Sequence, residues 1–357
     1  MHTQHGESAN NYTHLLHCRG DEGRWSQFEL LHTNASFSEF QEVAYPRQMR
    51  RARDYEVLDC KGLILFTTRL SIYAVEHAYL EPQLILWNPA IRMSMTLPQA
   101  CIVAPNRSKY FVYGFGFDHT SNDYKVLRMV FGSYIRLPPP AQLYRIRTGA
   151  WETFRIADDF QYDIADSDGD PQALVHGASH WIGYRSSFKG SEYPDELGMV
   201  IVLFDMCDEE LRVMKLPHRL SSTNAEIVRI GISGGLLCLM EHKPRKNAYW
   251  NWNIWLMKEY GIVESWTKQF AIDVNGSDLF SFMNNEKILV EKREKLVLYD
   301  LKTRRFNNLG GVKDKLGRIK AQGPLFAVNT FVESLVLFNV PDLFKEENQD
   351  MHERRLM

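Results

Sequence analysis

The chain has 357 residues, of which 45% are hydrophobic and 12% aromatic, and its formal net charge at pH 7 is −2. This apolar content excludes wholesale disorder, and the small net charge excludes a global positive field that would attract nucleic acid or an anionic membrane. No segment reaches the ~18 apolar residues of a membrane span, and the start lacks the features of a secretory signal. We therefore expect an intracellular protein of the cytoplasm or nucleus that binds neither nucleic acid nor membranes.

In chain order, we expect residues 1–24 to be a flexible N-terminal segment. The stretch WSQFELLHTNASFSEFQEV, from Trp25 to Val43, resembles the outer hairpin of a β unit that lacks its inner strands. The next five units repeat one pattern. A β-rich stretch with Gly, Asn or Asp at its entry precedes an apolar run that ends in an aromatic residue, a polar turn and a second short run. The aromatic positions, 44 to 60 residues apart, are Trp87, Tyr144, Phe204, Trp255 and Tyr299.

The turns inside these units have hairpin chemistry. Asn88-Pro89, Thr148-Gly149, Asp205 and Asp300 place turn-forming residues between the two runs of a unit. A spacing of this size accommodates about four strands and their loops, which is the size of one propeller blade. Helical periodicity is confined to the charged tail at residues 342–357. The pattern predicts an all-β chain.

The last β-rich stretch, LFAVNTFVESLVLF, looks like inner strands without a hairpin. Joined to the stretch that begins at Trp25, it would form a composite blade that closes a ring and removes exposed strand edges. The predicted fold is a β-propeller over residues 25–341 with six blades, although a seventh stays open. The Trp residues that occupy matching positions in the units are expected in its core: Trp87, Trp151, Trp181, Trp255 and Trp266.

These motifs together resemble a known family. LWNPAIRMSMTLP, YGFGFDHTSNDYKVLRM and, above all, IWLMKEYGIVESWTKQF are similar to the F-box-associated, kelch-like propeller domain of plant F-box proteins, in the same order from Gly62 to Phe338. The resemblance implies a non-catalytic module, without cofactor, that recruits a target protein to a Skp-cullin-F-box ubiquitin ligase. The stretch NNYTHLLH resembles the segment just downstream of an F-box. A Skp-type adaptor and a cullin are therefore expected as partners only if an F-box is present upstream.

Two glycine motifs resemble functional motifs, and we interpret both as structural. Residues 231–235 match the G-x-S-x-G nucleophile elbow, but that elbow requires a helix after Ser233, and the strand-like LLCLM follows. Residues 113–118 carry two of the three glycines of a dinucleotide fingerprint, and no helix begins there. We interpret the latter as a strand packed closely on its neighbour, with Asp118 and Asp123 organising the following turn. No catalytic residue is predicted.

Candidate metal ligands are equally weak. Asp163, Asp166, Asp168 and Asp170 lack the flanking helices and final Glu of an EF-hand, so we expect a solvated acidic loop. His176 and His180 lack a nearby third ligand, and His180 beside Trp181 is expected in the core. The five cysteines are scattered without a CxxC pair, which predicts free thiols and no structural zinc. No metal site and no cofactor are predicted.

The connections between the inner stretch and the hairpin should emerge on one face of the ring, and several are long. They carry Tyr, Trp and Arg side chains, the types that dominate protein interfaces. The alternative is that such loops merely tolerate insertions. The residues expected to bind a partner protein are Tyr73, Tyr134, Arg136, Arg185, Phe188, Tyr193, Arg245, Tyr249 and Trp250.

Three functions stay open at the level of sequence. The first is the substrate-recognition module of a ligase, or a fragment of one, whose target is unidentified. The second is a stand-alone scaffold or decoy that binds a target without ubiquitination. The third is a propeller enzyme acting on carbohydrate, which would need carboxylates or a His and Tyr metal set converging near the axis, and no such set is recognisable.

Overall fold

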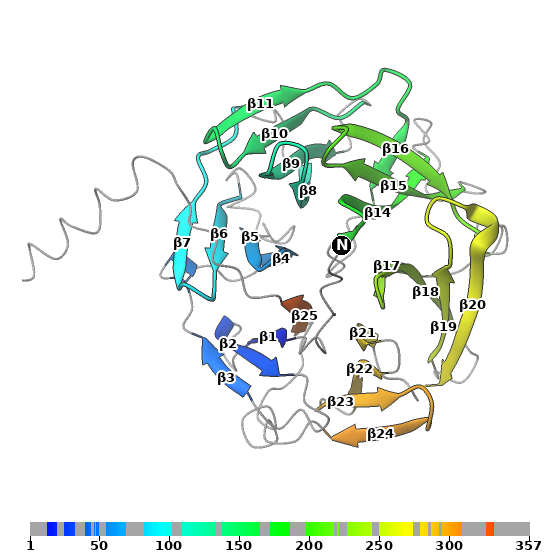
Figure 1. Cartoon of the computed structure of the whole chain (residues 1–357). Coiled ribbons are helices and arrows are strands. Elements are labelled where there is room, and N and C mark those ends of the chain that lie inside the picture. Colours follow the sequence, from blue (N-terminus) through cyan, green and yellow to red (C-terminus); the bar gives the residue numbers. More distant parts are fainter. Residues whose placement is uncertain are drawn as a thin grey trace, which may run out of the picture.

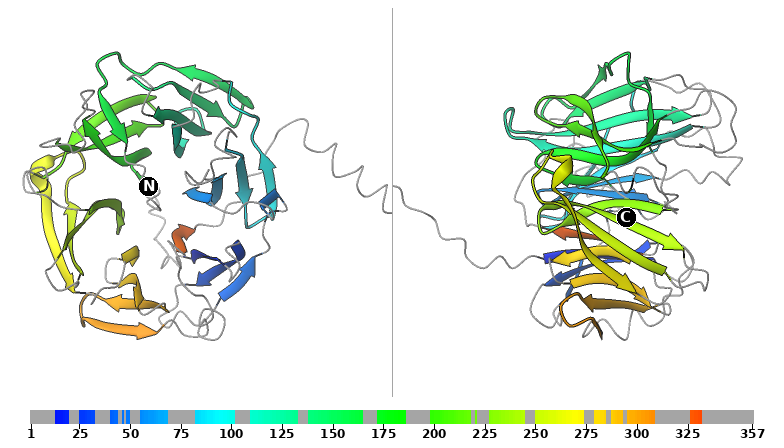
Figure 2. Two further views of the ribbon diagram at one scale, coloured as in Figure 1. Left: turned by 180° about the vertical axis from the view of Figure 1, so that it is seen from behind. Right: turned by 90° about the vertical axis from the view of Figure 1, so that its right-hand side faces the viewer.

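A computed structural model of the protein shows strands arranged as a ring of six antiparallel sheets (Figure 1). Side-on, the sheets stack around the ring as blades (Figure 2). The structure describes residues 13–19, 25–32, 40–43, 46, 48–49, 55–68, 82–101, 109–132, 138–164, 172–185, 198–217, 220, 227–244, 250–273, 279–284, 287–292, 295–308 and 326–331.

Three blades come from the first half of the chain. The first blade contains β4 (Tyr55–Cys60), β5 (Leu63–Thr68), β6 (Leu84–Asn88) and β7 (Met93–Thr96). The second contains β8 (Lys109–Asp118), β9 (Asp123–Gly132), β10 (Ala141–Arg145) and β11 (Ala150–Phe154). The third contains β12 (Tyr162–Ile164), β13 (Ala173–Val175), β14 (Ala178–Arg185), β15 (Met199–Asp205) and β16 (Glu210–Lys215), and its innermost position is shared by β12 and β13, which both pair with β14.

Two further blades follow. The fourth contains β17 (Ile227–Ser233), β18 (Leu236–Pro244), β19 (Trp250–Met257) and β20 (Trp266–Asp273), with the short 3-10 helix η2 (Val263–Ser265) before β20. The fifth contains β21 (Leu279–Asn284), β22 (Lys287–Lys292), β23 (Lys295–Asp300) and β24 (Arg305–Asn308). All five repeated units of the sequence pattern are therefore four-stranded or five-stranded sheets, and the prediction of an all-β propeller is confirmed.

The sixth sheet is the composite blade, in the order β25 (Phe326–Phe331), β1 (Thr13–Arg19), β2 (Trp25–His32) and β3 (Phe40–Val43). The two ends of the chain pair antiparallel from Thr13 opposite Phe331 to Cys18 opposite Phe326. We expected the N-terminal part to supply only a hairpin, and it supplies three strands. We expected residues 1–24 to be a flexible segment, but β1 lies within them. β1 pairs with β2, which would otherwise present an unpaired edge of N–H and C=O groups.

The hairpin turns have the predicted side-chain chemistry. Asn88 Oδ1 accepts a hydrogen bond from the Ala90 N–H at 3.0 Å, and Asp205 and Asp300 cap their turns in the same way. The residue before the fourth strand adopts a left-handed conformation in four blades, which aligns the strands with their natural twist. These residues are Arg92 (φ 57°), Gly149 (φ 67°), Glu209 (φ 53°) and Arg304 (φ 55°).

The second, third and fourth blades are apolar on both faces because each of them lies between two neighbours. On β9, Tyr124 and Val126 pack toward the first blade, whereas Leu127, Met129 and Phe131 pack toward the third. Alternate side chains of one strand therefore enter two different cores. This arrangement explains why strands such as β6 and β9 are buried almost continuously instead of alternating between buried and exposed residues.

The glycines of YGFGF let two blades approach closely, as we predicted. A Cβ at Gly114 would lie 3.1 Å from the Trp181 ring, and one at Gly116 would lie 2.6 Å from Met206 Cγ. The aromatic residue between them, Phe115, packs instead toward the first blade. The Gln172 side chain bridges the same junction, since it accepts from the Phe115 N–H at 2.8 Å and donates to the Phe115 carbonyl at 2.5 Å.

Replacing Gly116 by Ala should lower the free energy of unfolding by roughly 1–3 kcal/mol, because the added methyl group overlaps Met206 between the second and third blades. Gly198→Ala is the matched control, since a Cβ at Gly198 meets nothing within 4 Å. Urea denaturation of both variants measures the difference. Equal stability of the two variants would contradict the close-packing argument.

Candidate functional site

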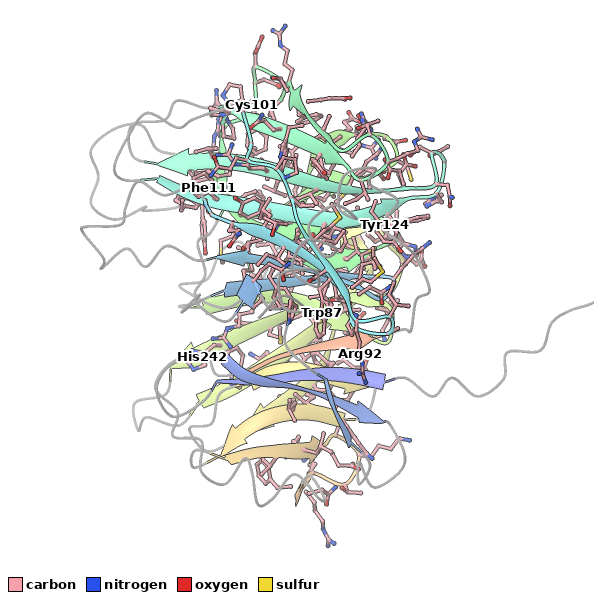
Figure 3. The ribbon with its side chains drawn as sticks, turned by 90° about the vertical axis from the view of Figure 1, so that its left-hand side faces the viewer. Trp87, Arg92, Cys101, Phe111, Tyr124 and His242 are labelled. Carbon is pink, nitrogen blue, oxygen red and sulfur yellow. The ribbon has the colours of Figure 1, made fainter. Side chains whose placement is uncertain are left out.

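The ring has two faces, which differ in the connections that they carry. The hairpin face carries the turns between the first and second strands and between the third and fourth strands of a blade, which in the first blade are Lys61–Gly62 and Pro89–Arg92. At the opposite face, which we call the loop face, the second strands end and the third strands begin, as at Thr68 and Leu84 of the first blade. Tyr124 and Arg92 lie toward the hairpin face, whereas Phe111 and His242 lie toward the loop face (Figure 3).

The predicted partner-binding residues fall mostly outside the described residues. Arg185 is the exposed last residue of β14, and Trp250 is the first residue of β19, so both stand at the loop-face ends of their strands. The face on which these two were expected is therefore consistent with the topology, and their role in binding stays a prediction. Those outside the described residues are Tyr73, Tyr134, Arg136, Phe188, Tyr193, Arg245 and Tyr249.

A cavity of about 290 Å³ opens at the loop-face end of the first blade, where this blade meets the second. The first blade contributes Gln83 before β6 and Thr96 at the end of β7. Pro98 follows β7, and the second blade supplies Tyr113 from β8 and Arg128 from β9. We call this cavity the interblade pocket. It is small for a ligand site, since such sites usually span roughly 300–1,000 Å³.

The strand register explains why the Arg128 side chain lies at this pocket. Arg128 lies directly opposite Tyr113 on β8 and Gln142 on β10, so the three side chains share the blade surface that faces the first blade. The adjacent row toward the hairpin face is apolar, with Val126 opposite Phe115 and Tyr144. The packing between the two blades thus changes from apolar to polar within one step along β9, and the pocket opens at that step.

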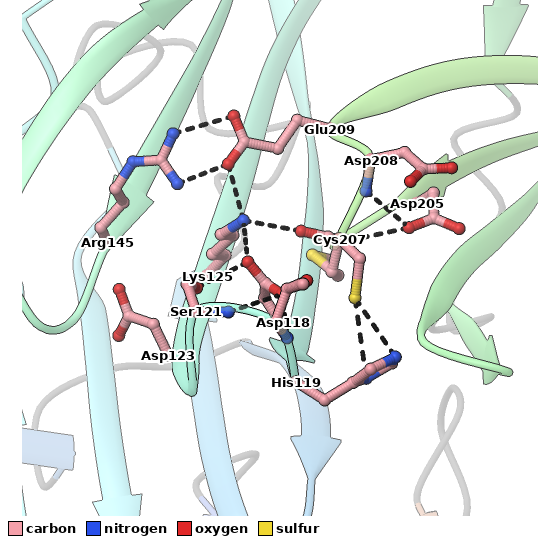
Figure 4. Close-up of polar contacts among 12 residues, drawn as sticks. Asp118, His119, Ser121, Asp123, Lys125, Arg145, Asp205, Cys207, Asp208 and Glu209 are labelled. Carbon is pink, nitrogen blue, oxygen red and sulfur yellow. Dashed lines mark hydrogen bonds and ion pairs between the residues drawn. The ribbon is translucent and has the colours of Figure 1, made fainter.

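A second polar group lies on the hairpin face, between the second and third blades (Figure 4). Lys125 Nζ donates to Asp118 Oδ2 and to Glu209 Oε1, each at 2.6 Å. It also donates to the Met206 carbonyl oxygen at 2.7 Å, so all three ammonium hydrogens have acceptors. Arg145 binds both oxygens of Glu209, at 2.5 and 2.8 Å. This group joins the second and third blades.

The carboxylates of this group are held in their charged form. Burial alone would raise the pKa of Asp118, but hydrogen bonds from Lys125, Ser121 and Thr120 outweigh it and keep the pKa well below its ordinary range. Hydrogen bonds from Arg145 and Lys125 likewise lower the pKa of Glu209. Asp118 also organises the turn before β9, as expected, through the Thr120 N–H at 2.8 Å.

The glycine motif around Ser233 and the acidic residues from Asp163 lie in ordinary structural elements. Ser233 ends β17, and Gly234 and Gly235 form the turn into β18 with φ values of 57° and 76°. A strand follows the serine where a nucleophile elbow needs a helix. Asp163 lies in β12 and not in a loop, which corrects our expectation; Asp166, Asp168 and Asp170 lie outside the described residues.

His176 stands in the turn between β13 and β14, whereas His180 is buried in β14, so the two do not share a strand face. Trp151 is only partly buried, unlike the other four Trp residues expected in the core. Burial raises the pKa of the Cys60 thiol to about 12. Within the described part of the chain, no group of three or more His, Cys, Asp and Glu side chains is arranged to hold a metal ion.

His180 forms one polar link between the third and fourth blades. Its Nδ1 donates to the Ala173 carbonyl at 2.9 Å, so Nε2 accepts from the Tyr260 hydroxyl at 2.8 Å in the neutral ring. Burial lowers the pKa of His180 to about 4. Tyr260 belongs to the KEYGIVESW segment of the fourth blade and is 38% exposed. Through its contact with His180, this segment covers the junction of the third and fourth blades at the hairpin face.

Inspection of the sequence missed two charged residues at the blade junctions. Lys125 and Arg128 stand within β9, DYKVLRMVFG, and each is 1% exposed. The available signal was a pair of cations in an otherwise apolar run, where buried charges need specific partners. The partners come from other strands and another blade, which no local pattern identifies.

The comparisons with known proteins agree with this architecture. The family described as the F-box associated beta propeller domain matches residues 26–337, which span nearly the whole ring. The chain belongs to this F-box-associated propeller family. The resemblance noted in the sequence is thereby confirmed.

Relatives of this F-box-associated propeller are F-box proteins. The F-box protein CPR1 of Arabidopsis thaliana is 28% identical over 301 residues, which cover 74% of this chain and 67% of CPR1. An F-box/kelch-repeat protein of the same plant is 25% identical over 276 residues, or 73% of this chain and 67% of its own length. Another F-box protein is 24% identical and is covered over 64% of its length. The propeller thus spans about two thirds of these relatives.

Solved structures resemble the F-box-associated propeller only remotely. The propeller domain of the Trilobed protease from Pyrococcus furiosus is 12% identical, with a TM-score of 0.36 over 85% of this chain and 93% of that one. YjhT is 12% identical, with a TM-score of 0.38 over 79% of this chain and 90% of that one. Values this low carry no argument about function.

Replacing Lys125 by Met should destabilise the F-box-associated propeller by roughly 3–5 kcal/mol, because Asp118 would remain buried with its cation removed. Arg155→Met is the control. Its ion pair with Asp158 joins side chains that are 83% and 78% exposed, and its loss should change stability by less than about 1 kcal/mol. Chemical denaturation measures both. A loss for Lys125→Met no larger than that of the control would show that the group does not join the blades.

The stability of the propeller should fall as pH falls from about 6.5 toward about 4, because unfolded His180 takes up a proton in this range while the buried ring does not. His180→Gln should flatten the pH dependence of the free energy of unfolding in this window. Tyr260→Phe, which removes only the hydroxyl partner, should keep most of it. An unchanged slope in His180→Gln would refute the assignment.

Proposed function

We propose that this propeller is the substrate-recognition module of an SCF-type ubiquitin ligase, a non-catalytic part that binds a target protein while other subunits transfer ubiquitin. The observation that carries the proposal is the family match over residues 26–337, shared with relatives named F-box proteins. The proposed role predicts a location in the cytoplasm or nucleus. In the described residues, no helix has the length and apolar character to cross a membrane.

The geometry supports binding rather than chemistry. The charged groups between the second and third blades are paired inside the protein, where they hold blades together. The loop face instead offers the interblade pocket and the strand ends at Arg185 and Trp250. A rigid ring that presents variable connections on one face is a common scaffold for protein recognition.

Contacts with a Skp-type adaptor and a cullin belong to the proposal only for a protein that carries an F-box. The matched region covers 64–67% of the three relatives described above. This similarity therefore supports the propeller and says nothing about adaptor binding. The propeller's own proposed partner is the target protein.

Proximity labelling in plant cells with the chain as bait tests the role. Proteins labelled by the bait should lose ubiquitin and accumulate when cullin ligases are inhibited, because their recognition then leads to no transfer. Quantitative proteomics of ubiquitin remnants measures both changes. If the ubiquitin content and abundance of the labelled proteins stayed constant, the ligase role would be contradicted. The chain would then be a binding protein that does not lead to ubiquitination.

A further inference from the structure

The charges at the hairpin face are divided between two sides of the ring. In the described turns of the first and second blades, the exposed Lys, Arg, Asp and Glu residues are all cations, and they are Lys61, Arg92 and Arg147. Lys61 lies over the Phe117 ring, 3.8 Å from its centroid, and Arg147 donates to the Ser121 carbonyl oxygen at 3.4 Å. No described carboxylate forms an ion pair with any of the three cations. This side of the hairpin face is therefore positive.

The turn between β15 and β16 of the third blade is acidic. It carries Asp208, and Glu210 follows at the start of β16. Both carboxylates pair with Arg212, which lies 2.8 Å from Asp208 and 2.6 Å from Glu210. The three side chains are 46–60% exposed. One cation thus stands against two carboxylates, and the turn keeps a negative charge that another molecule can reach.

The turn between β19 and β20 of the fourth blade is acidic as well. It exposes Glu259 and Glu264 together with one cation, Lys258. Ser265 fixes the shape of this turn, since its Oγ accepts from the Glu259 N–H at 3.1 Å and donates to the Ile262 carbonyl oxygen at 2.7 Å. The third and fourth blades therefore form a negative side of the hairpin face, and part of it is a rigid turn.

Apolar side chains are exposed on both sides of the face. In the fourth blade, Tyr260 and Ile262 are 38% and 48% exposed, and Ile232, near the hairpin-face end of β17, is 38% exposed. Grouped apolar side chains of this kind are typical of interaction surfaces. On the positive side, the turn of the first blade has Ala90 exposed and Ile91 half-buried. Each side thus combines charge of one sign with apolar groups.

The order of the blades makes this face complementary to itself. The two positive blades are followed around the ring by the two negative ones (Figure 1). A twofold axis in the plane of the face, between the second and third blades, places the second blade of one copy over the third blade of another and the first over the fourth. The turns that meet all join the third and fourth strands of their blades, so they lie at similar distances from the ring axis. They are residues 89–92, 146–149, 206–209 and 258–265.

We propose that two copies of this chain associate through their hairpin faces about such an axis. Arg147 of one copy then meets Asp208 of the other, and Arg92 meets Glu264. The exposed apolar side chains of the fourth blade pack against those of the first. Every contact occurs twice, because a twofold interface uses the same surface on both copies.

The dimer leaves both loop faces free, since they point away from the interface. Thr13 and Phe331, the ends of the described chain, lie in the sixth blade, outside the four blades that carry the contacts. The inference does not rest on the ligase role and goes beyond it, because a dimer presents two loop faces at once. Exposed ion pairs contribute little individually and are screened by salt, so the association should be weak and salt-dependent.

Analytical ultracentrifugation of the full chain, over series of protein and salt concentrations, tests the association. The chain should change from monomer to dimer as its concentration rises. The dissociation constant should increase at least about tenfold from low to high salt, because salt screens the exposed charges. A monomer at every concentration would overturn the proposal, and so would a dimer whose dissociation constant does not depend on salt.

Charge reversal tests which surfaces meet. Arg92→Glu and Glu264→Arg should each weaken dimerisation at least about tenfold, because like charges then meet twice in the interface. An equimolar mixture of the two variants should dimerise as the unaltered chain does, because both contacts again join opposite charges. Arg155→Glu, which makes the same charge change at an 83% exposed side chain after β11, is the matched control and should dimerise normally.

The mixture also guards against a folding defect, since a misfolded variant would not regain dimerisation on mixing. Thermal unfolding reports the integrity of each variant by itself. The proposal is wrong if either variant dimerises like the unaltered chain, or if the mixture dimerises no better than its components. None of these measurements involves ubiquitin, so the dimer and the ligase role fail separately.

Discussion

A blade of this propeller cannot cover either of its faces with its own strands, and the second, third and fourth blades bury their apolar side chains against both neighbours. The dependence runs around the ring and is satisfied only when the last blade meets the first. The antiparallel pairing of β1 with β25 supplies this closure, since it builds the final blade from both ends of the chain. The innermost strand β25 then contacts β21 of the fifth blade on one side and β4 of the first blade on the other, so the ring of blades is closed.

Several features follow from this constraint. Gly114 and Gly116 remove side-chain volume where the second blade approaches the third, and Gln172 satisfies the backbone of Phe115 at the same junction. Lys125 closes the hairpin-face end of that junction with paired charges in place of apolar contacts. Buried ion pairs of this kind contribute little net stability but strongly penalise any arrangement that separates the partners. They therefore favour one relative position of the two blades.

The junction between the first and second blades ends differently. Its apolar row through Val126 gives way to Arg128, and the blades part to leave the interblade pocket on the loop face. A recognition site at such a position combines rigid walls, made by strands, with the connections between strands, whose length is free to vary.

By itself, the sequence determined the β class, the five repeated hairpins and the turn residues Asn88, Asp205 and Asp300, because short apolar runs and turn chemistry involve near neighbours along the chain. Its motifs also identified the family. Only the tertiary structure decided that β1 belongs to the closing blade, that Lys125 meets Glu209 and that Arg128 lines a pocket. These contacts join residues that are distant in sequence and lie in different strands or blades. They depend on how twisted sheets pack around a closed ring, and no local pattern of residues encodes that geometry.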